Sequence, residues 1–269
     1  MNKIITLTTD FGQADEYAGV MKGVILGICP EARIVDLSHG ILPQDILQAA
    51  FLINASYAYF PANTLHVIVV DPGVGSDRRI ILARADGHRF LAPDNGVLTW
   101  LLQRPRFEIA YEVSCRQLFL KQLSNTFHGR DIFAPVAAHL ANGFPESNVG
   151  RVLNRDELTV LSLPEAKFDK TTGILTGSII SIDRFGNLLT NIHHDFLSSL
   201  IPAGSYPKIT ITINNQTIQG LQPSYASVPE GSLLAIIGSR NYLEIAANHA
   251  NAAHILGAAT NTEVRLCLP

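Results

Sequence analysis

The sequence predicts an α/β protein of two domains: an N-terminal α/β domain with a mostly parallel sheet, and a smaller C-terminal domain of antiparallel β-structure. Three observations support this prediction. Residues 64–70 form an unbroken apolar, β-branched run, which is typical of a strand covered on both faces. Strand-like and helix-like segments alternate over residues 4–70, which predicts βαβ units. From residue 173 onward, short strand-like segments follow one another with few helical segments between them.

The N-terminal segments predict a Rossmann-like sheet domain. The predicted strands are residues 4–9, 33–37, 64–70, 80–83, 88–91 and 108–113. The predicted helices are residues 17–28, 46–53, 94–102 and 132–140. Asp45 is placed to cap the second helix, and Gly143 to end the last one. Asp86-Gly87 is typical of a two-residue hairpin, so we expect the sheet to become mixed there.

The C-terminal segments predict a small antiparallel barrel or sandwich, because turn residues separate the short strands. Residues 144–172 are less patterned, so we place the joint between the domains near residues 165–172. The predicted domains are therefore residues 1–166 and 172–269. The predicted strands of the second domain are residues 173–183, 187–192, 208–213, 233–237, 243–246 and 263–268.

Composition and charge narrow the class of protein. Hydrophobic residues make up 47% of the 269 residues and charged residues 16%, which is typical of a well-packed globular protein. The net charge of −3 provides no basic field for nucleic acid. The 3 cysteines are widely spaced, so we expect neither a disulfide framework nor a thiolate metal site. No apolar run suits a signal peptide or a membrane span, so we expect a cytoplasmic protein without a membrane partner.

Polar residues follow three successive predicted strands at the same edge of the sheet. Asp10 follows the first strand, Ser38-His39 the second, and Asp71 the third, where Pro72 and two glycines allow a sharp turn. In open α/β sheets, ligands bind at the carboxyl ends of the strands. Taken alone, Asp71 fits a structural role in a tight turn as well as it fits a functional one. The convergence of three strand ends favours the functional interpretation.

The sequence contains no complete kinase, dinucleotide-binding or metal-binding motif. Asp10-Phe-Gly and Arg130-Asp131 resemble kinase signatures, but their order is reversed and no glycine-rich loop with a partner lysine occurs. Gly73-Val-Gly75 lacks the third glycine of a dinucleotide fingerprint. No pair of histidines has the i, i+4 spacing of metal ligands on a helix. We therefore expect no cofactor and no catalytic metal.

Asp71, Arg78 and His128 are the candidate catalytic residues. Individually, Arg78 fits a solvated surface cation, and His128 fits a histidine at a helix N-terminus, where the helix dipole disfavours its protonated form. Together, they can form a carboxylate paired with a guanidinium, next to a neutral imidazole that orients or accepts a proton. Such a set can position and polarise one water molecule.

Seven motifs run through nearly the whole chain in this order: Thr8-Thr-Asp-Phe-Gly12, Val35-Asp-Leu-Ser-His39, Val70-Asp-Pro-Gly-Val-Gly75 with Arg78, Ala92-Pro-Asp-Asn-Gly96, Thr126-Phe-His-Gly-Arg-Asp131, Asp183-Arg-Phe-Gly-Asn187 with Thr190-Asn-Ile192, and Gly238-Ser-Arg-Asn-Tyr-Leu243. Together they resemble the motifs of the S-adenosylmethionine (SAM) hydroxide adenosyltransferases, or SAM hydrolases. That family is related to fluorinating and chlorinating enzymes that act on the same substrate.

The resemblance implies that SAM and water give adenosine and methionine by displacement at the ribose 5′ carbon, without a cofactor. Asp71, Arg78 and His128 match the residues that activate the water in that family. The family forms homotrimers, which implies active sites between the first domain of one subunit and the second domain of its neighbour. The positions that match substrate-binding residues are Asp10 for the ribose hydroxyls, Phe127 for a wall of the site, Asn187 for adenine, and Asp183, Ser239 and Arg240 for the amino and carboxylate groups of methionine.

Two other functions stay open at this point. The halogenating relatives carry an inserted loop where this chain has only Asp86-Gly87, and Tyr-type residues at the positions of Asp71 and His128. They also present a small hydroxyl residue to the halide where this chain has Gly129. These differences favour water over halide as the nucleophile. The second alternative is a SAM- or adenosine-binding sensor without turnover.

Overall fold

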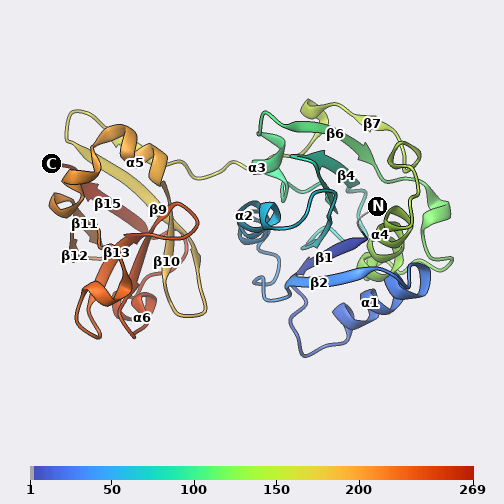
Figure 1. Cartoon of the computed structure of the whole chain (residues 1–269), viewed down its shortest axis with the longest axis horizontal. Helices are drawn as coiled ribbons and strands as arrows, with labels where there is room; N and C mark the ends of the chain where they lie inside the picture. The colour runs from blue at the N-terminus through green and yellow to red at the C-terminus, as the bar shows by residue number, and fades with distance from the viewer. Residues whose placement is uncertain (1–2) are drawn as a thin grey trace. The chain divides into compact units, whose positions relative to one another are not determined.

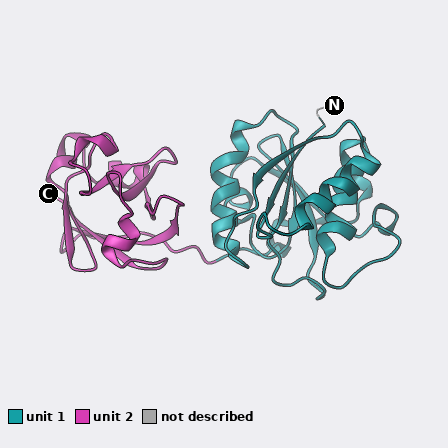
Figure 2. Cartoon of the chain, turned by 90° about the horizontal axis from the view of Figure 1, so that it is seen from below, with its two compact units in different colours: residues 1–161 teal, residues 162–269 magenta. Residues whose placement is uncertain are grey.

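The computed structural model describes residues 3–269, and the chain divides into two compact units between residues 161 and 162 (Figure 2). Each unit has its own sheet and its own hydrophobic core. The first two residues of the predicted N-terminal domain lie outside the described residues. The predicted domain boundaries at residues 166 and 172 stay a prediction.

A mixed sheet forms the centre of the first unit (Figure 1). Among the described residues it has seven strands, in the order β2-β1-β3-β5-β4-β6-β7. Strands β2, β1, β3 and β5 are parallel, whereas β4, β6 and β7 pair antiparallel with their neighbours, so the prediction of a sheet that becomes mixed is confirmed. The strands are β1 (Ile4–Thr9), β2 (Arg33–Ser38), β3 (Leu65–Val69), β4 (Ile80–Ala85), β5 (His88–Pro93), β6 (Phe107–Glu112) and β7 (Val152–Leu153).

Helices cover both faces of this sheet (Figure 1). α1 (Tyr17–Ile28) and α4 (Ala134–Ala141) pack on one face, and α2 (Ile46–Ser56) and α3 (Thr99–Leu102) on the other. Alternate side chains of β3 therefore enter two separate cores, which explains why its sequence is apolar almost without a break. Single 3₁₀ turns lie at Tyr57–Tyr59, Arg116–Leu118, Glu146–Asn148 and Arg155–Glu157.

Two predicted helix starts had different outcomes. Asp45 caps α2 by accepting a hydrogen bond from the Gln48 backbone N–H at 2.8 Å, as predicted. The helix predicted for residues 94–102 was wrong in its first half, because α3 begins only at Thr99. The cause is Gly96, whose φ of +93° lies outside the right-handed helical region. This glycine forms a turn before the helix.

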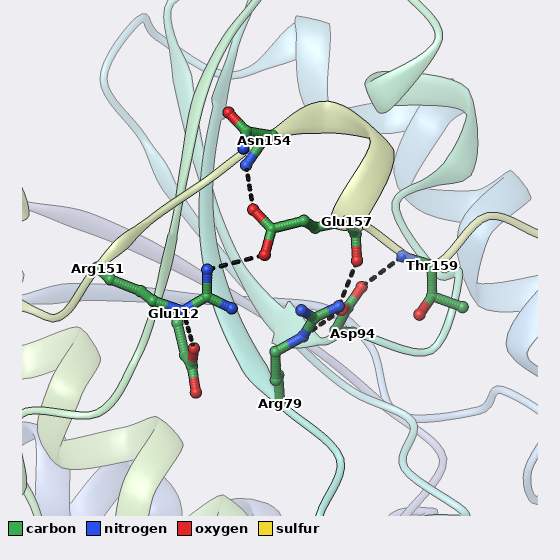
Figure 3. Close-up of polar contacts among 7 residues, drawn as sticks. All are labelled: Arg79, Asp94, Glu112, Arg151, Asn154, Glu157 and Thr159. Carbon is green, nitrogen blue, oxygen red and sulfur yellow. Dashed lines mark hydrogen bonds and ion pairs between the residues drawn. The ribbon is translucent and has the colours of Figure 1, made fainter.

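The segment that leads out of the first unit is fixed to the end of the sheet (Figure 3). Arg79 Nε donates to Asp94 Oδ2 at 2.9 Å, and Asp94 Oδ1 accepts from the Thr159 backbone N–H at 2.9 Å. Arg79 also donates to the Glu157 carbonyl, and the Glu157 side chain accepts from Arg151 at 2.8 Å. The Asp94 side chain at the centre of this network is only 2% exposed, so its contacts with Arg79 and Thr159 are shielded from water. It fixes the residue that directly follows the candidate catalytic arginine.

The second unit is a nearly closed antiparallel barrel (Figure 1). Its strands have the order β12-β11-β15-β9-β10-β14-β13, and β8 also pairs with β9. Leu221, just after β12, bridges Ala235 of β13 and so brings the two ends of the sheet together around one apolar core. The strands are β8 (Lys167–Asp169), β9 (Ile174–Ile182), β10 (Leu188–His193), β11 (Thr210–Ile213), β12 (Gln216–Gln219), β13 (Leu233–Ile237), β14 (Tyr242–Ala247) and β15 (Glu263–Cys267).

The C-terminal prediction is confirmed for six of these strands, but it omitted β8 and β12. β12 pairs with β11 through Asn214-Asn215, whose φ values of +43° and +64° suit a two-residue hairpin. Three of the four β12 side chains are exposed, so it has no apolar alternation to detect. The helices are short, at α5 (His194–Leu200) and α6 (Ala252–Leu256), with 3₁₀ turns at Ala203–Lys208 and Tyr225–Ser227. Among the described residues, no helix has the length and apolar character that crossing a membrane requires.

Candidate active site

The carboxyl end of β3 leads directly into the loop that carries Asp71. Two turns follow: the Val74 N–H donates to the Asp71 carbonyl at 3.1 Å, and the Ser76 N–H donates to the Gly73 carbonyl at 3.1 Å. These turns reverse the direction of the chain and bring the Arg78 side chain into contact with the Asp71 carboxylate. The sequence therefore builds the first contact of the site from eight consecutive residues.

Arg78 holds the Asp71 carboxylate through two of its nitrogen atoms. Nε lies 2.8 Å from both Oδ1 and Oδ2, and Nη2 also donates to Oδ2. The Asp71 side chain is 5% exposed and the Arg78 side chain 11%. A bidentate pair with so little exposure has one defined geometry, so the carboxylate is held in a fixed orientation.

His128 joins this pair from a loop far along the chain. Arg78 Nη2 lies 2.9 Å from His128 Nδ1. A guanidinium can only donate, so Nδ1 accepts this hydrogen bond and the proton of the neutral ring is on Nε2. The ring can therefore donate from Nε2 to an oxygen atom while Arg78 connects it to the carboxylate.

The surroundings of His128 favour its neutral form. Burial lowers the pKa of His128 below its usual 6.5, and the positive charge of Arg78 lowers this pKa further. Asp71 and Asp131 act in the opposite direction but do not reverse the shift. The ring is therefore uncharged near pH 7, in agreement with its acceptor role toward Arg78.

We expect the acid limb of the kcat/KM profile to lie below pH 6.5. Protonation of His128 removes the acceptor at Nδ1, so activity should fall as the pH drops through the depressed pKa of this ring. Initial rates measured across the acid range test this. The variant His128→Gln cannot titrate and should lose this limb while keeping residual activity. A midpoint above 6.5, or the same limb in the variant, would contradict the assignment.

Two contacts hold the loop that carries His128. Asp131 is fully buried and accepts a hydrogen bond from the Ser124 backbone N–H at 2.6 Å. Gly75 lies so close to this loop that a Cβ added there would be 2.4 Å from the Asn125 carbonyl oxygen. The loop after β3 and the loop before α4 are thus in direct contact. The sequence analysis did not name Asp131 as a site residue, although it lies in the motif that contains His128.

Asp71 and His128 line a cavity of about 190 Å³ at this edge of the sheet. Asp10 and Phe127 line the same cavity, so the structure brings these four predicted site residues together, with Arg78 in contact with two of them. Asp10 Oδ2 accepts a hydrogen bond from the Gln44 backbone N–H at 2.8 Å. The sequence analysis did not name Gln44 as a site residue.

An aromatic cluster forms one wall of the cavity. The Phe127 ring lies 5.9 Å from the Phe11 ring and 5.0 Å from the Tyr17 ring, in edge-to-face geometry. Gly129 is packed against this cluster: a Cβ there would lie 3.1 Å from a Phe127 ring carbon and 3.2 Å from Met21 Sδ. A larger residue at position 129 would have to displace the wall.

His39, which was predicted at the same edge, has contacts inside the fold. Its Nδ1 lies 2.8 Å from Thr9 Oγ1, and its Nε2 lies 3.1 Å from Asp36 Oδ1. Its carbonyl accepts from the Gly12 N–H at 2.8 Å, so His39 supports the loop that contains Asp10. Within residues 3–269, no group of three or more His, Cys, Asp and Glu side chains is arranged to hold a metal ion.

In the second unit, Asp183 and Asn187 lie on the connection between β9 and β10. Asp183 Oδ1 accepts from the Phe185 N–H at 2.8 Å and from the Asn187 N–H at 2.9 Å, and Oδ2 accepts from Asn187 Nδ2 at 3.0 Å. The carboxylate therefore shapes its own loop. A carboxylate has about four acceptor positions, so capacity for a ligand remains.

Asp183 and Asn187 line a second cavity, of about 530 Å³, that also includes two aromatic side chains missed in the sequence analysis. These are Phe185, which is 77% exposed, and Tyr225, which is 43% exposed. The signal for Phe185 was its position between Asp183 and Asn187, whereas Tyr225 lies in a segment without a motif. Ser239 and Arg240 form the exposed turn between β13 and β14.

Comparison with known proteins places both units in one family. Residues 5–150 match the SAM hydroxide adenosyltransferase N-terminal domain, and residues 177–265 match the C-terminal domain of that family. The chain belongs to the SAM hydroxide adenosyltransferase family. The resemblance predicted from the seven motifs is thereby confirmed.

Members and relatives of this family match over nearly the full length of the chain. An (R)-S-adenosyl-L-methionine hydrolase of Thermus thermophilus is 34% identical, over 96% of this chain and 97% of its own. A fluorinase of Actinoplanes sp. is 31% identical, over 94% of this chain and 93% of its own. A crystal structure of a conserved protein from Thermotoga maritima has a TM-score of 0.90 and 34% identity, and the match covers 98% of this chain and 99% of that one.

Proposed function

We propose that this protein hydrolyses SAM to adenosine and methionine. The observation that carries the proposal is the contact of Asp71, Arg78 and His128 beside a cavity, in a chain whose family includes SAM hydrolases. The three side chains supply a fixed carboxylate and a neutral imidazole, which are the groups needed to hold one water molecule and take a proton from it.

In the proposed reaction, a water molecule is bound between Asp71 and His128. His128 Nε2 donates to the water oxygen, and Asp71 accepts a water proton. The oxygen attacks the ribose 5′ carbon, the carbon–sulfur bond breaks, and its electron pair stays on sulfur. Methionine leaves as a neutral thioether, which needs no general acid. Attack on a sulfonium brings opposite charges together, so a site with little water accelerates the reaction.

The remaining predicted residues fit roles in substrate binding. Asp10 lines the same cavity as Asp71 and can accept hydrogen bonds from ribose hydroxyls, and Phe127 closes one side. In the second unit, Asp183 can meet the ammonium group of methionine, whereas Ser239 and Arg240 can bind its carboxylate. Asn187 offers an amide to adenine, and the exposed ring of Phe185 beside it offers a stacking surface.

We also propose that the active protein is a homotrimer whose sites combine the first unit of one subunit with the second unit of its neighbour. The cavity beside Asp71, at about 190 Å³, is small for a ligand of the size of SAM. The groups suited to the base and the amino acid lie in the other unit. This division of the binding groups supports a site completed by a second unit.

Halogenation of SAM is the alternative that the fluorinase relatives raise. Three features favour hydrolysis. The β4–β5 connection is the two-residue turn Asp86-Gly87 without an insertion. Asp71 and His128 are both in place beside the cavity. Finally, position 129 is a glycine packed tightly against the Phe127 ring, where the halogenating enzymes present a hydroxyl group.

Incubation of the purified protein with SAM in ¹⁸O-labelled water tests the proposal. We expect adenosine and methionine in equal amounts, with one ¹⁸O atom in the adenosine 5′-hydroxyl and none in methionine. Addition of fluoride or chloride is the matched control and should not change the products. A 5′-halogenated nucleoside made only with halide would assign halogenation instead. Tight binding of SAM without product would assign a sensor.

A further inference from the structure

The second unit contains a side-chain contact that none of the roles above uses. Tyr225 Oη donates to Glu244 Oε1 at 2.6 Å. Tyr225 lies in the connection between β12 and β13, and its ring lines the 530 Å³ cavity together with Asp183, Phe185 and Asn187. Glu244 is therefore the hydrogen-bond partner of a residue that forms the wall of a proposed substrate pocket.

The position of Glu244 on its strand explains why it meets Tyr225. Its neighbours on β14, Leu243 and Ile245, point into the barrel core and are fully buried. Side chains alternate along a strand, so Glu244 lies on the outer face. The β12–β13 connection lies against this face, where Val228 packs on Leu234, Ile236 and Ala246 of the same sheet.

The absence of a side chain at Gly238 leaves room for the Glu244 carboxylate. A Cβ added to Gly238, at the end of β13, would lie 2.9 Å from Glu244 Oε2. Any other residue at position 238 would therefore move this carboxylate, which is the hydrogen-bond acceptor of Tyr225. Gly238 begins the turn that carries Ser239 and Arg240, so the turn and the carboxylate are packed together.

The charges around Glu244 connect it to the other proposed binding groups. Burial raises the pKa of Glu244 above its usual 4.5, whereas the hydrogen bond from Tyr225 opposes this shift. The charge of Asp183 also raises this pKa, and the charge of Arg240 lowers it. Glu244 thus lies within electrostatic range of two residues assigned to the methionine part of the substrate.

We propose that Glu244 is a positioning residue, which holds Tyr225 against the pocket of the second unit and thereby fixes the aromatic wall that binds the nucleoside part of the substrate. Glu244 acts through Tyr225 and not on the reacting atoms, because the proposed catalytic side chains belong to the first unit. The inference rests on the proposed function for the identity of the nucleoside. Its effect should appear in KM and in adenosine affinity, and not in kcat.

Three substitutions in the full-length protein test this inference. Tyr225→Phe keeps the ring but removes the hydrogen bond, and Glu244→Ala removes the acceptor. We expect both to raise KM for SAM and Kd for adenosine by up to about tenfold, because each removes one hydrogen bond to a charged group, with kcat within twofold. Glu244→Gln keeps an acceptor oxygen for Tyr225 and should stay within threefold of the wild type.

Glu263→Ala is the matched control, because it removes an exposed glutamate from another strand of the same barrel, β15, which does not pair with β14. It should leave KM, Kd and kcat unchanged. Thermal unfolding followed by circular dichroism verifies that each variant is folded. If Glu244→Ala unfolds, Tyr225→Phe decides the question, since it deletes one hydroxyl group.

The outcomes separate this inference from the proposed function. Unchanged adenosine affinity in Tyr225→Phe and Glu244→Ala would overturn the positioning role, even if SAM is hydrolysed. A Glu244→Gln variant as weak as Glu244→Ala would overturn it as well, because charge and not the hydrogen bond would then matter. Absence of SAM turnover in the wild type would refute the proposed function, whereas calorimetric titration with adenosine would still test Glu244.

Discussion

Asp71→Asn should lower kcat by about 100-fold or more, since a positioned general base contributes this much to a rate. The amide is nearly isosteric with the carboxylate, so the loop should keep its shape, but the amide cannot take a proton from water. Arg78 also loses its charged partner, although its contact with His128 at 2.9 Å remains. Single-turnover kinetics with SAM and calorimetric binding of SAM measure the two effects separately, and binding should change little.

Asp77→Asn is the control for this experiment. Asp77 lies in the same loop but is exposed, so the substitution changes the net charge equally without touching the pair. Its kcat should match the wild type. Wild-type turnover in Asp71→Asn would remove this carboxylate from the mechanism. Equal losses in both variants would point to the overall charge of the loop instead.

Gly75→Ala should abolish most activity by separating the two loops of the active site. Gly75 has a φ of +81°, and a Cβ there would lie 2.4 Å from the Asn125 carbonyl oxygen. The backbone at Asn125 cannot move aside without displacing the segment that leads to His128. We expect a loss of stability of about 1–2 kcal/mol from the left-handed conformation alone, and an additional loss of kcat because Arg78 and His128 move apart.

Gly87→Ala separates these two effects. Gly87 has a similar φ of +73°, but a Cβ there would meet no atom within 4 Å. It lies in the β4–β5 hairpin, at the opposite edge of the sheet from Asp71. Urea unfolding of Gly87→Ala should show the cost of the left-handed conformation alone, and Gly75→Ala should lose this amount plus the cost of the clash, whereas only Gly75→Ala should lose activity. Full activity in Gly75→Ala would mean that the contact between the loops is not needed.

The architecture of the first unit was largely predictable because its strands obey strong local rules. The run that became β3 is apolar on both faces, and Asp45 precedes a helix with a standard capping side chain. The helix wrongly predicted for residues 94–98 shows a case that these local rules do not cover. Gly96 adopts a left-handed conformation, and nothing in the local pattern distinguishes it from a glycine tolerated near a helix start.

The candidate site was predictable where it is local and unpredictable where it depends on packing. Asp71 and Arg78 meet through two consecutive turns, which the prolines and glycines of the loop indicate. His128 is 50 positions away from Arg78 in the sequence. It meets Arg78 where Gly75 allows the backbone at Asn125 to approach the loop after β3. The sequence analysis grouped these three residues by their chemistry, and the motifs of the family supported the grouping.

The polar groups of the second unit were harder to predict. Glu244 is a single charged residue within an apolar strand, and period-two alternation places it on the outer face without indicating a partner. Its partner Tyr225 lies in a connection that contains no regular strand or long helix. Only the packed structure relates the two, since the hydrogen bond spans 19 residues.

The division into two compact units has a consequence for how such an enzyme diversifies. The groups proposed to position the attacking water are in residues 1–161, and the aromatic side chains proposed to contact the base are in residues 162–269. Substitutions in the second set can therefore alter which nucleoside is accepted while the displacement chemistry is inherited unchanged. Laboratory evolution toward sulfonium substrates with other bases should accordingly accumulate its first useful mutations around Phe185 and Tyr225.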